Sequence, residues 1–182
     1  MEEPSEPQPI SPAFRTGAAL LVVGALVIML VAMLKPKISL FDLGGPGEVL
    51  EASFTVPGEF APRSLSSFRG RAVVVALWTA ARCDECPGQL LALNELATRY
   101  GPDGLVALAL TESAPSEIVA YPGIGGLQIL TGSLAKAQAD TLEKTRPYVY
   151  VLDRQGRLRH KSGGLKQASD LSGAVEKALA LN

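Results

Sequence analysis

Two cysteines, the only ones among 182 residues, lie two residues apart between an apolar run and a helical pattern. The run at residues 72–77 is rich in valine, which is typical of a strand buried on both faces. Residues 89–97 have leucines at helical spacing. A thiol at such a junction lies near the positive end of a helix dipole, which lowers its pKa. Cys83 and Cys86 therefore predict a dithiol/disulfide redox site.

Other uses of the cysteine pair are less consistent with the sequence. Two cysteines and one histidine, His160, cannot fill a four-ligand zinc site within one chain, although a site shared across a dimer stays open. A structural disulfide that closes so small a loop adds little stability. We interpret His160 as a solvated strand residue and expect no bound metal. The net charge of −1 gives no reason to expect a nucleic-acid partner.

The N-terminal part of the chain predicts a membrane anchor. Residues 17–34 carry no charge, and as a helix they would span roughly 27 Å, about the thickness of the hydrocarbon core. A cleaved signal peptide would have a basic start, a shorter apolar run and a small-x-small site. We therefore expect a disordered tail at residues 1–16, a single transmembrane helix at 17–34, a Gly/Pro-rich linker at 35–47 and a globular domain at 48–182.

Charge alone does not orient this anchor. Arg15 precedes the apolar segment, and Lys35 and Lys37 follow it. The positive-inside rule leans by one charge toward a cytoplasmic domain.

The domain alternates strand-like runs with helical patterns. Strands are expected at residues 49–56, 72–77, 105–110, 127–130, 148–152 and 157–161. Helices are expected at residues 89–100, 133–141 and 170–181, with Ser133 as a cap, and a turn or 3₁₀ segment at 64–71. Residues 113–126 contain several Pro and Gly and predict a loop. The strand-helix-strand order predicts parallel neighbouring strands and an α/β fold.

The two sulfurs of the dithiol are expected to have different roles. At a helix start the first sulfur points outward and the second is covered, so Cys83 would attack and Cys86 would resolve the mixed disulfide. Arg82 favours the Cys83 thiolate, whereas Asp84 and Glu85 oppose it. The two acids favour a reductant, but they also suit the first turn of any helix.

Several segments together resemble the thioredoxin superfamily, and most closely its membrane-anchored TlpA/ResA-like thiol:disulfide oxidoreductases. The likeness covers about residues 50–181. The segments that carry it are residues 53–56 with 64–71, Trp78 with Cys83-x-x-Cys86, and Pro147 with the strand at 148–152 and the turn at 153–156. The resemblance implies a thioredoxin-like three-layer fold with a mixed central sheet.

The resemblance also implies site residues. Pro147 would be cis and face the dithiol, and Arg146 would present its backbone to a substrate cysteine. Trp78 and Arg82 would lie on the substrate side. Glu112 corresponds to a glutamate near the site in ResA-like members, where it would handle the proton of Cys86; the alternative is a solvated loop acid.

The chain departs from the family pattern around the first cysteine. One residue more than usual separates Trp78 from Cys83, and Arg82 stands where a second tryptophan is common. Gln89 stands where a glutamate is frequent, and no proline lies between the cysteines. A peroxiredoxin would have its threonine three residues before the cysteine, whereas Thr79 lies four before Cys83. A copper carrier would need a longer cysteine spacing.

The expected function is that of a bacterial membrane-tethered thiol:disulfide oxidoreductase. It would reduce disulfides of exported proteins, apocytochromes c among them, on the periplasmic side of the cytoplasmic membrane. It would need no cofactor besides the Cys83–Cys86 disulfide, and a membrane electron donor would reduce it again. The alternative is a redox-silent thioredoxin-like scaffold subunit of a membrane complex.

Overall fold

The computed structural model describes residues 47–81, 83–135 and 146–181. The predicted tail, the predicted anchor and nearly all of the predicted linker lie outside these residues, as do Arg82 and residues 136–145. Within the described ranges, no helix combines the length and apolar character needed to cross a bilayer. The described residues fall in one structural unit, Ser39–Asn182.

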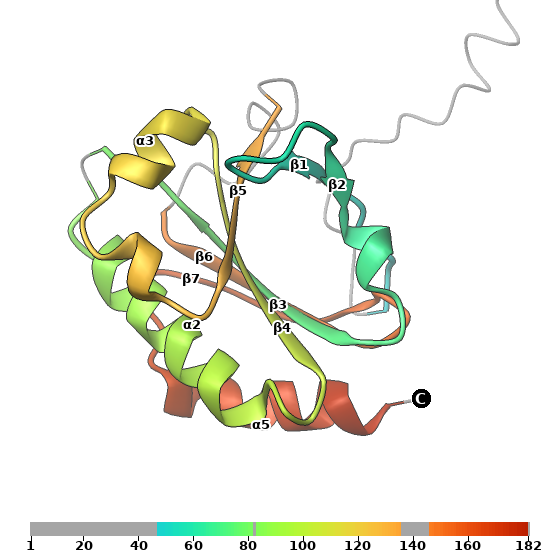
Figure 1. Cartoon of the computed structure of the whole chain (residues 1–182). Coiled ribbons are helices and arrows are strands. Elements are labelled where there is room, and N and C mark those ends of the chain that lie inside the picture. Colours follow the sequence, from blue (N-terminus) through green and yellow to red (C-terminus); the bar gives the residue numbers. More distant parts are fainter. Residues whose placement is uncertain (1–46, 82, 136–145, 182) are drawn as a thin grey trace, which may run out of the picture. The chain divides into compact units, whose positions relative to one another are not determined.

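A seven-stranded mixed sheet in the order β2-β1-β5-β4-β3-β6-β7 forms the centre of this unit (Figure 1). β3 (Ala72–Trp78) pairs in parallel with β4 (Leu105–Thr111) and antiparallel with β6 (Tyr148–Leu152). Every residue of β3 and β4 is buried. The predicted buried strands, their parallel pairing and the mixed α/β sheet are confirmed.

Shorter strands complete both sides of the sheet. They are β1 (Ser53–Thr55), β2 (Arg63–Ser64), β5 (Leu130–Leu134) and β7 (Leu158–Gly163). β5 runs parallel to β4, and β1 and β7 are antiparallel to their neighbours. β6 and β7 form the predicted hairpin, whereas the strand predicted at residues 49–56 is reduced to β1 and a bridge from Val49 to Arg157.

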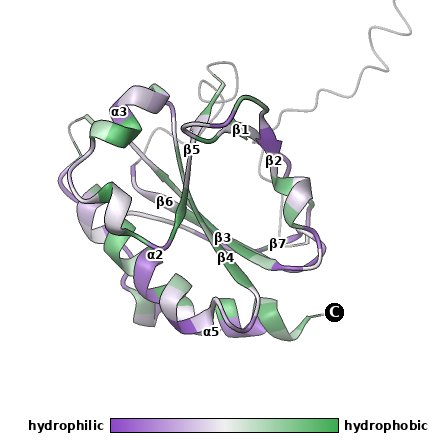
Figure 2. Cartoon of the chain, in the orientation of Figure 1, coloured by the Kyte–Doolittle hydropathy of each residue, from purple (hydrophilic) through white to green (hydrophobic). Residues whose placement is uncertain are grey.

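The described α-helices pack against one face of the sheet. They are α2 (Cys86–Tyr100), α3 (Pro115–Ala120) and α5 (Ala168–Ala180). Alternate residues of β3, such as Val74 and Ala76, point into the core under these helices. The residues between them, Val73 and Val75, point into a second core on the other face. Figure 2 shows the apolar central strands and the more polar helices that cover one face of them.

The second face has a thinner cover within the described residues. The 3₁₀ turn η1 (Leu65–Phe68) and the chain around β1 lie over it, and Phe54 stacks with Phe68 at a centroid distance of 6.4 Å. Within the described residues, the predicted third layer consists of η1 and the chain around β1.

α2 and α5 contact each other on the first face, where the Tyr100 hydroxyl donates a hydrogen bond to Glu176 at 2.7 Å. This hydrogen bond raises the pKa of Tyr100.

The predicted loop at residues 113–126 is wrong in part, because it contains α3 and the 3₁₀ turn η2 (Ile124–Gly126). Pro115 does not break the chain here, because it occupies the first turn of α3, where a missing N–H costs nothing. Glu117 closes the helix start by accepting a hydrogen bond from the Ala114 N–H at 2.9 Å.

The helix predicted at residues 133–141 is also wrong where it can be compared. Ser133 and Leu134 belong to β5, which runs from Leu130 rather than over 127–130, and residues 136–141 lie outside the described residues. The Ser133 hydroxyl donates to the Ser113 carbonyl at 2.7 Å instead of capping a helix. Pairing with β4 and β1 stabilises this strand, although Gly132 at its centre has low strand propensity.

Candidate active site

The two cysteines form a disulfide where the chain passes from β3 into α2. Their Cα atoms are 5.4 Å apart, within the usual range for a disulfide. Cys86 is the first residue of α2 and is fully buried, whereas Cys83 is partly exposed. Cys83 is therefore the accessible sulfur and Cys86 the covered one, as the spacing predicts.

The turn before the disulfide is held by the loop that follows β4. The Ala80 N–H donates to the Ser113 hydroxyl at 3.4 Å, and the Ser113 N–H donates to the Thr111 hydroxyl at 3.1 Å. A hollow of about 310 Å³ beside this turn is lined in part by Ala81 and Glu117. Because β3 and β4 are parallel, their carboxyl ends place these loops at the same edge of the sheet.

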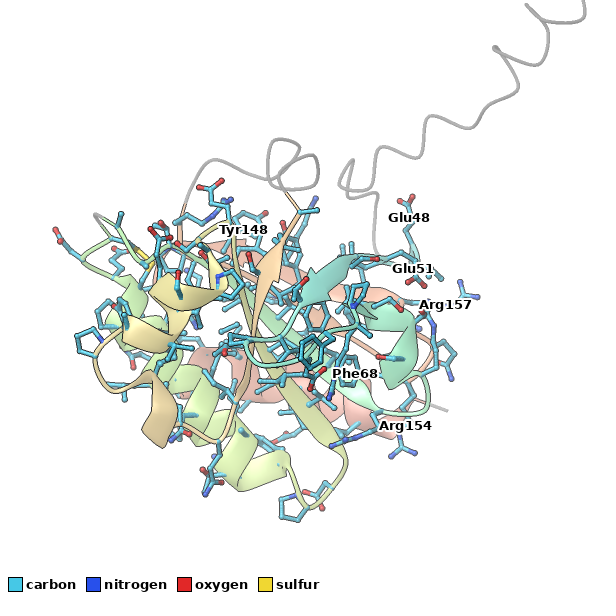
Figure 3. All side chains as sticks on the ribbon, turned by 45° about the horizontal axis from the view of Figure 1, so that its top comes forward. Glu48, Glu51, Phe68, Tyr148, Arg154 and Arg157 are labelled. Atoms are coloured by element: carbon cyan, nitrogen blue, oxygen red, sulfur yellow. A yellow bond between two sulfur atoms is a disulfide. The ribbon has the colours of Figure 1, made fainter. Side chains whose placement is uncertain are left out.

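Pro147 lies at this edge because of the strand register. Leu77 near the end of β3 pairs with Tyr148 at the start of β6, and Pro147 directly precedes Tyr148. The Arg146–Pro147 peptide bond is cis, as the thioredoxin resemblance implies. Pro147 is buried, Arg146 is half-buried, and the Pro147 carbonyl accepts a hydrogen bond from the Gly164 N–H at 2.9 Å. Figure 3 shows Tyr148 and Arg154 toward opposite ends of β6.

The β7–α5 loop, residues 164–167, connects the proline segment to the dithiol helix. Glu85 Oε2 accepts a hydrogen bond from the Leu165 N–H at 3.0 Å. Gln89 Oε1 accepts one from the Lys166 N–H at 2.9 Å. Glu85, which lies between the cysteines, therefore binds a neighbouring loop in addition to being an acid near the start of the helix. This contact requires the tertiary fold and was not predicted from the sequence.

The burial of the Gln89 side chain is not predicted from the sequence. Gln89 is fully buried one helical turn after Cys86, and its Nε2 has no hydrogen-bond partner within the described ranges. Its spacing from Leu93 and Leu96 on one helix stripe could have indicated this burial. As an amide, Gln89 cannot take up or release a proton near pH 7.

Trp78 is completely buried at the end of β3. Its indole meets the Tyr121 ring edge to face, with ring centroids 4.8 Å apart. Tyr121 is half-buried and follows α3. Trp78 therefore packs beneath Tyr121, and its place on the substrate side stays a prediction.

The remaining predicted site residues have different placements. Glu112 is exposed after β4, and none of the hydrogen bonds or ion pairs between described residues joins it to the dithiol. This placement agrees with the solvated-acid alternative. Arg82 lies outside the described residues. No group of three or more His, Cys, Asp or Glu side chains in the described part of the chain is arranged to hold a metal ion.

The arrangement permits thiol–disulfide exchange. An accessible sulfur lies beside a covered one at a helix start, where the dipole stabilises a thiolate. A cis-proline segment flanks the same edge of the sheet, so an extended polypeptide could approach the Cys83 sulfur there.

Solved structures with this fold include thiol:disulfide oxidoreductases. A thiol:disulfide interchange protein from Bacteroides sp. is 20% identical, with a TM-score of 0.64 over 75% of this chain and 91% of that one. The thioredoxin domain of a thiol-disulfide oxidoreductase from Bacteroides vulgatus is 20% identical, with a TM-score of 0.63 over 74% and 97%. A thioredoxin family protein from Chlorobium tepidum TLS, a thiol:disulfide interchange protein, is 16% identical, with a TM-score of 0.60 over 75% and 99%.

No curated protein matches the chain. The model of the AhpC/TSA family matches residues 50–168, which is more than half of the chain and contains the dithiol and the cis-proline. The chain therefore belongs to the AhpC/TSA family, with a thioredoxin-like fold.

Proposed function

We propose that this protein is a thiol:disulfide oxidoreductase of the TlpA/ResA-like type that reduces disulfides of exported proteins. The observation that carries the proposal is the Cys83–Cys86 disulfide at the start of α2, with one sulfur accessible and one buried. The similar structures from Bacteroides species and Chlorobium tepidum are described as thiol:disulfide proteins, which supports the same chemistry here.

The proposed reaction begins with the reduced dithiol. The Cys83 thiolate attacks one sulfur of a substrate disulfide, so a mixed disulfide forms and the first substrate thiolate leaves and takes a proton. The Cys86 thiolate then attacks the Cys83 sulfur, which releases the second substrate thiolate, and this also takes a proton. The substrate gains two electrons and two protons, and the enzyme is left with the Cys83–Cys86 disulfide.

The reduced state must be restored by a second dithiol. The proposed donor is a membrane-bound dithiol carrier, which becomes oxidised as it regenerates the Cys83 and Cys86 thiols. The uncharged segment at residues 17–34 supports a membrane tether, since its length suits a bilayer. We place the domain on the outer side of the bacterial cytoplasmic membrane, with apocytochromes c among the candidate substrates. Glu112 stays a candidate for moving the Cys86 proton through water, and Arg146 for presenting its backbone to the substrate.

A Cys86→Ala variant tests the proposed reaction. Without the resolving thiol, mixed disulfides between Cys83 and its substrates should persist in cells and appear as larger bands on non-reducing gels. Reductant should remove these bands. The matched control is the Cys83→Ala/Cys86→Ala double variant, which should give none. If the single variant captures no partner and the wild-type chain does not reduce insulin, the proposal is wrong.

A redox-silent scaffold is the second candidate. Glu85, which lies between the cysteines, holds the β7–α5 loop, so this part of the turn has a structural contact independent of catalysis. The scaffold predicts that the double-alanine variant keeps full activity in cells, whereas the oxidoreductase predicts complete loss.

A further inference from the structure

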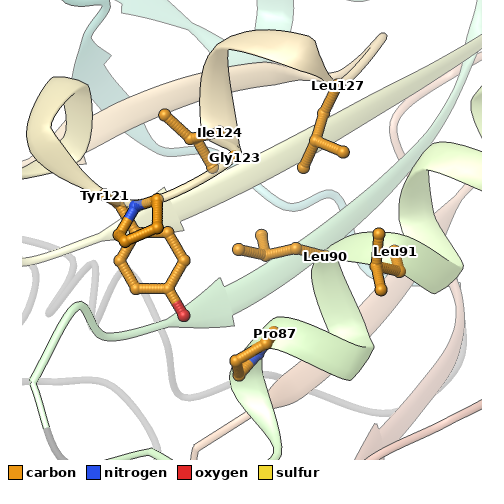
Figure 4. A pocket seen from close by; sticks show the side chains of 8 residues that line it. Pro87, Leu90, Leu91, Tyr121, Gly123, Ile124 and Leu127 are labelled. Atoms are coloured by element: carbon orange, nitrogen blue, oxygen red, sulfur yellow. The ribbon is translucent and has the colours of Figure 1, made fainter.

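An apolar groove runs beside the dithiol, between the first turns of α2 and the segment that follows α3 (Figure 4). Leu90 and Ile124, which are almost fully buried, form its floor. Pro87 and Leu91 of α2 lie on one side, and Tyr121 lies on the other, as Figure 4 shows. None of the described residues that line the groove is charged.

The size of the groove suits one side chain. Its volume is about 140 Å³. An apolar protein cavity of roughly 150 Å³ holds one benzene molecule. The groove is thus large enough for one aromatic or branched aliphatic side chain, but not for a folded element.

The rim of the groove exposes apolar surface that the domain itself does not cover. Leu91 is 62% exposed although it is a large apolar residue on the side of α2 that borders the groove. Exposed apolar surface next to an apolar hollow is characteristic of a binding site.

The groove lies next to the dithiol along the chain. Pro87 follows the buried Cys86 directly, and Tyr121 on the opposite wall packs on Trp78 at the end of β3. A polypeptide that reaches the Cys83 sulfur and continues along the first turns of α2 places residues close to its own cysteine over this groove.

We propose that the groove selects the substrate polypeptide by taking an apolar side chain that lies next to its reactive cysteine. This inference rests on the proposed oxidoreductase function and adds a specificity to it. Leu91, Leu90 and Ile124 are the residues that would contact the substrate side chain. The preferred substrates are accordingly incompletely folded proteins, since in folded proteins apolar residues of this kind are mostly buried.

Two peptide disulfides test this specificity with the reduced full chain in detergent. Each is a disulfide-linked dimer of a short peptide, with phenylalanine and leucine beside the cysteine in one and glycines in the other. We expect the apolar-flanked peptide to react about tenfold faster, since filling a hydrophobic pocket typically gives 10- to 200-fold discrimination and this groove is open on one side. A Leu91→Gln variant should reduce this ratio to about threefold or less.

The matched control is Val119→Gln, which changes an equally exposed apolar residue of α3 that does not line the groove. It should keep the wild-type ratio. Because each ratio compares two substrates on the same sample, it does not depend on how much of a variant is folded. Equal rates for the two peptides, or an unchanged ratio in Leu91→Gln, overturn the groove proposal alone. If neither peptide nor a small disulfide such as oxidised glutathione reacts, the oxidoreductase function fails, and this inference fails with it.

Discussion

At the residue scale, Gln89 distinguishes this site from the family pattern that the sequence resembles. The resemblance implies a glutamate at this position, whereas the amide here is buried one turn after Cys86. The side-chain oxygen of Gln89 accepts a hydrogen bond from the Lys166 N–H. In the same loop, the Gly164 N–H donates a hydrogen bond to the Pro147 carbonyl. Gln89 therefore links the dithiol helix to the cis-proline segment, and in the proposed reaction the Cys86 proton would need another route.

A Gln89→Leu variant tests this positioning role. Leucine keeps the volume but removes the acceptor of the Lys166 N–H, and a buried donor left without a partner costs about 1–3 kcal/mol. Loss of the unpaired Nε2 offsets part of this cost, so the free energy of unfolding should fall by about 1 kcal/mol. Urea denaturation of the oxidised protein measures the change. The same substitution at the exposed Gln155 should stay within about 0.5 kcal/mol of wild type. A Gln89→Leu variant as stable as wild type would show that this hydrogen bond does not hold the loop.

At the element scale, the β6–β7 hairpin depends on one buried carboxylate. Asp153 is fully buried, and its Oδ1 accepts hydrogen bonds from the Gln155 and Arg157 N–H groups, both at 2.9 Å. Its Oδ2 accepts one from Arg159 Nε at 2.7 Å. The hairpin fixes the direction of β6, and the register of β6 on β3 places Pro147 at the dithiol edge.

An Asp153→Ala variant should lower the free energy of unfolding by about 3 kcal/mol, because it removes three hydrogen bonds from a buried charged acceptor. Arg159 is partly exposed, so water can solvate the charge that remains. The matched control is Glu59→Ala, which breaks the exposed Glu59–Arg63 ion pair and should cost less than about 1 kcal/mol. Equal losses in the two variants would contradict a special role for the buried carboxylate.

At the scale of the whole molecule, the proposed tether and the site make a joint prediction about location. Cys83 and Cys86 are the only thiols in the chain, so labelling of the reduced protein reports the position of the domain directly. A membrane-impermeant maleimide should label intact cells after mild reduction if the domain lies outside the cytoplasmic membrane. The double-alanine variant supplies the background. Labelling that occurs only after lysis would instead agree with the excess of basic residues that follow the apolar segment.

The sequence by itself determined the core of the fold and the chemistry of the two sulfurs. Residues 72–77 and 105–110 predicted buried parallel strands because continuous apolar runs of that length leave few alternatives. The spacing of Cys83 and Cys86 at a helix start likewise indicated which sulfur is accessible. These features depend on neighbours within one or two turns of chain.

The tertiary structure alone decided the surroundings of the dithiol. β5 is a strand because β4 and β1 pair with it, although its central glycine has low strand propensity. α3 begins at a proline, a residue that by itself predicts an interruption of regular structure. The contacts of Glu85 and Gln89 with the β7–α5 loop join positions about 80 residues apart in the chain. The groove beside Pro87 also depends on a long-range contact, between α2 and the segment that follows α3. Long-range contacts of this kind follow from the packing of the whole sheet and leave no periodic signal in the sequence.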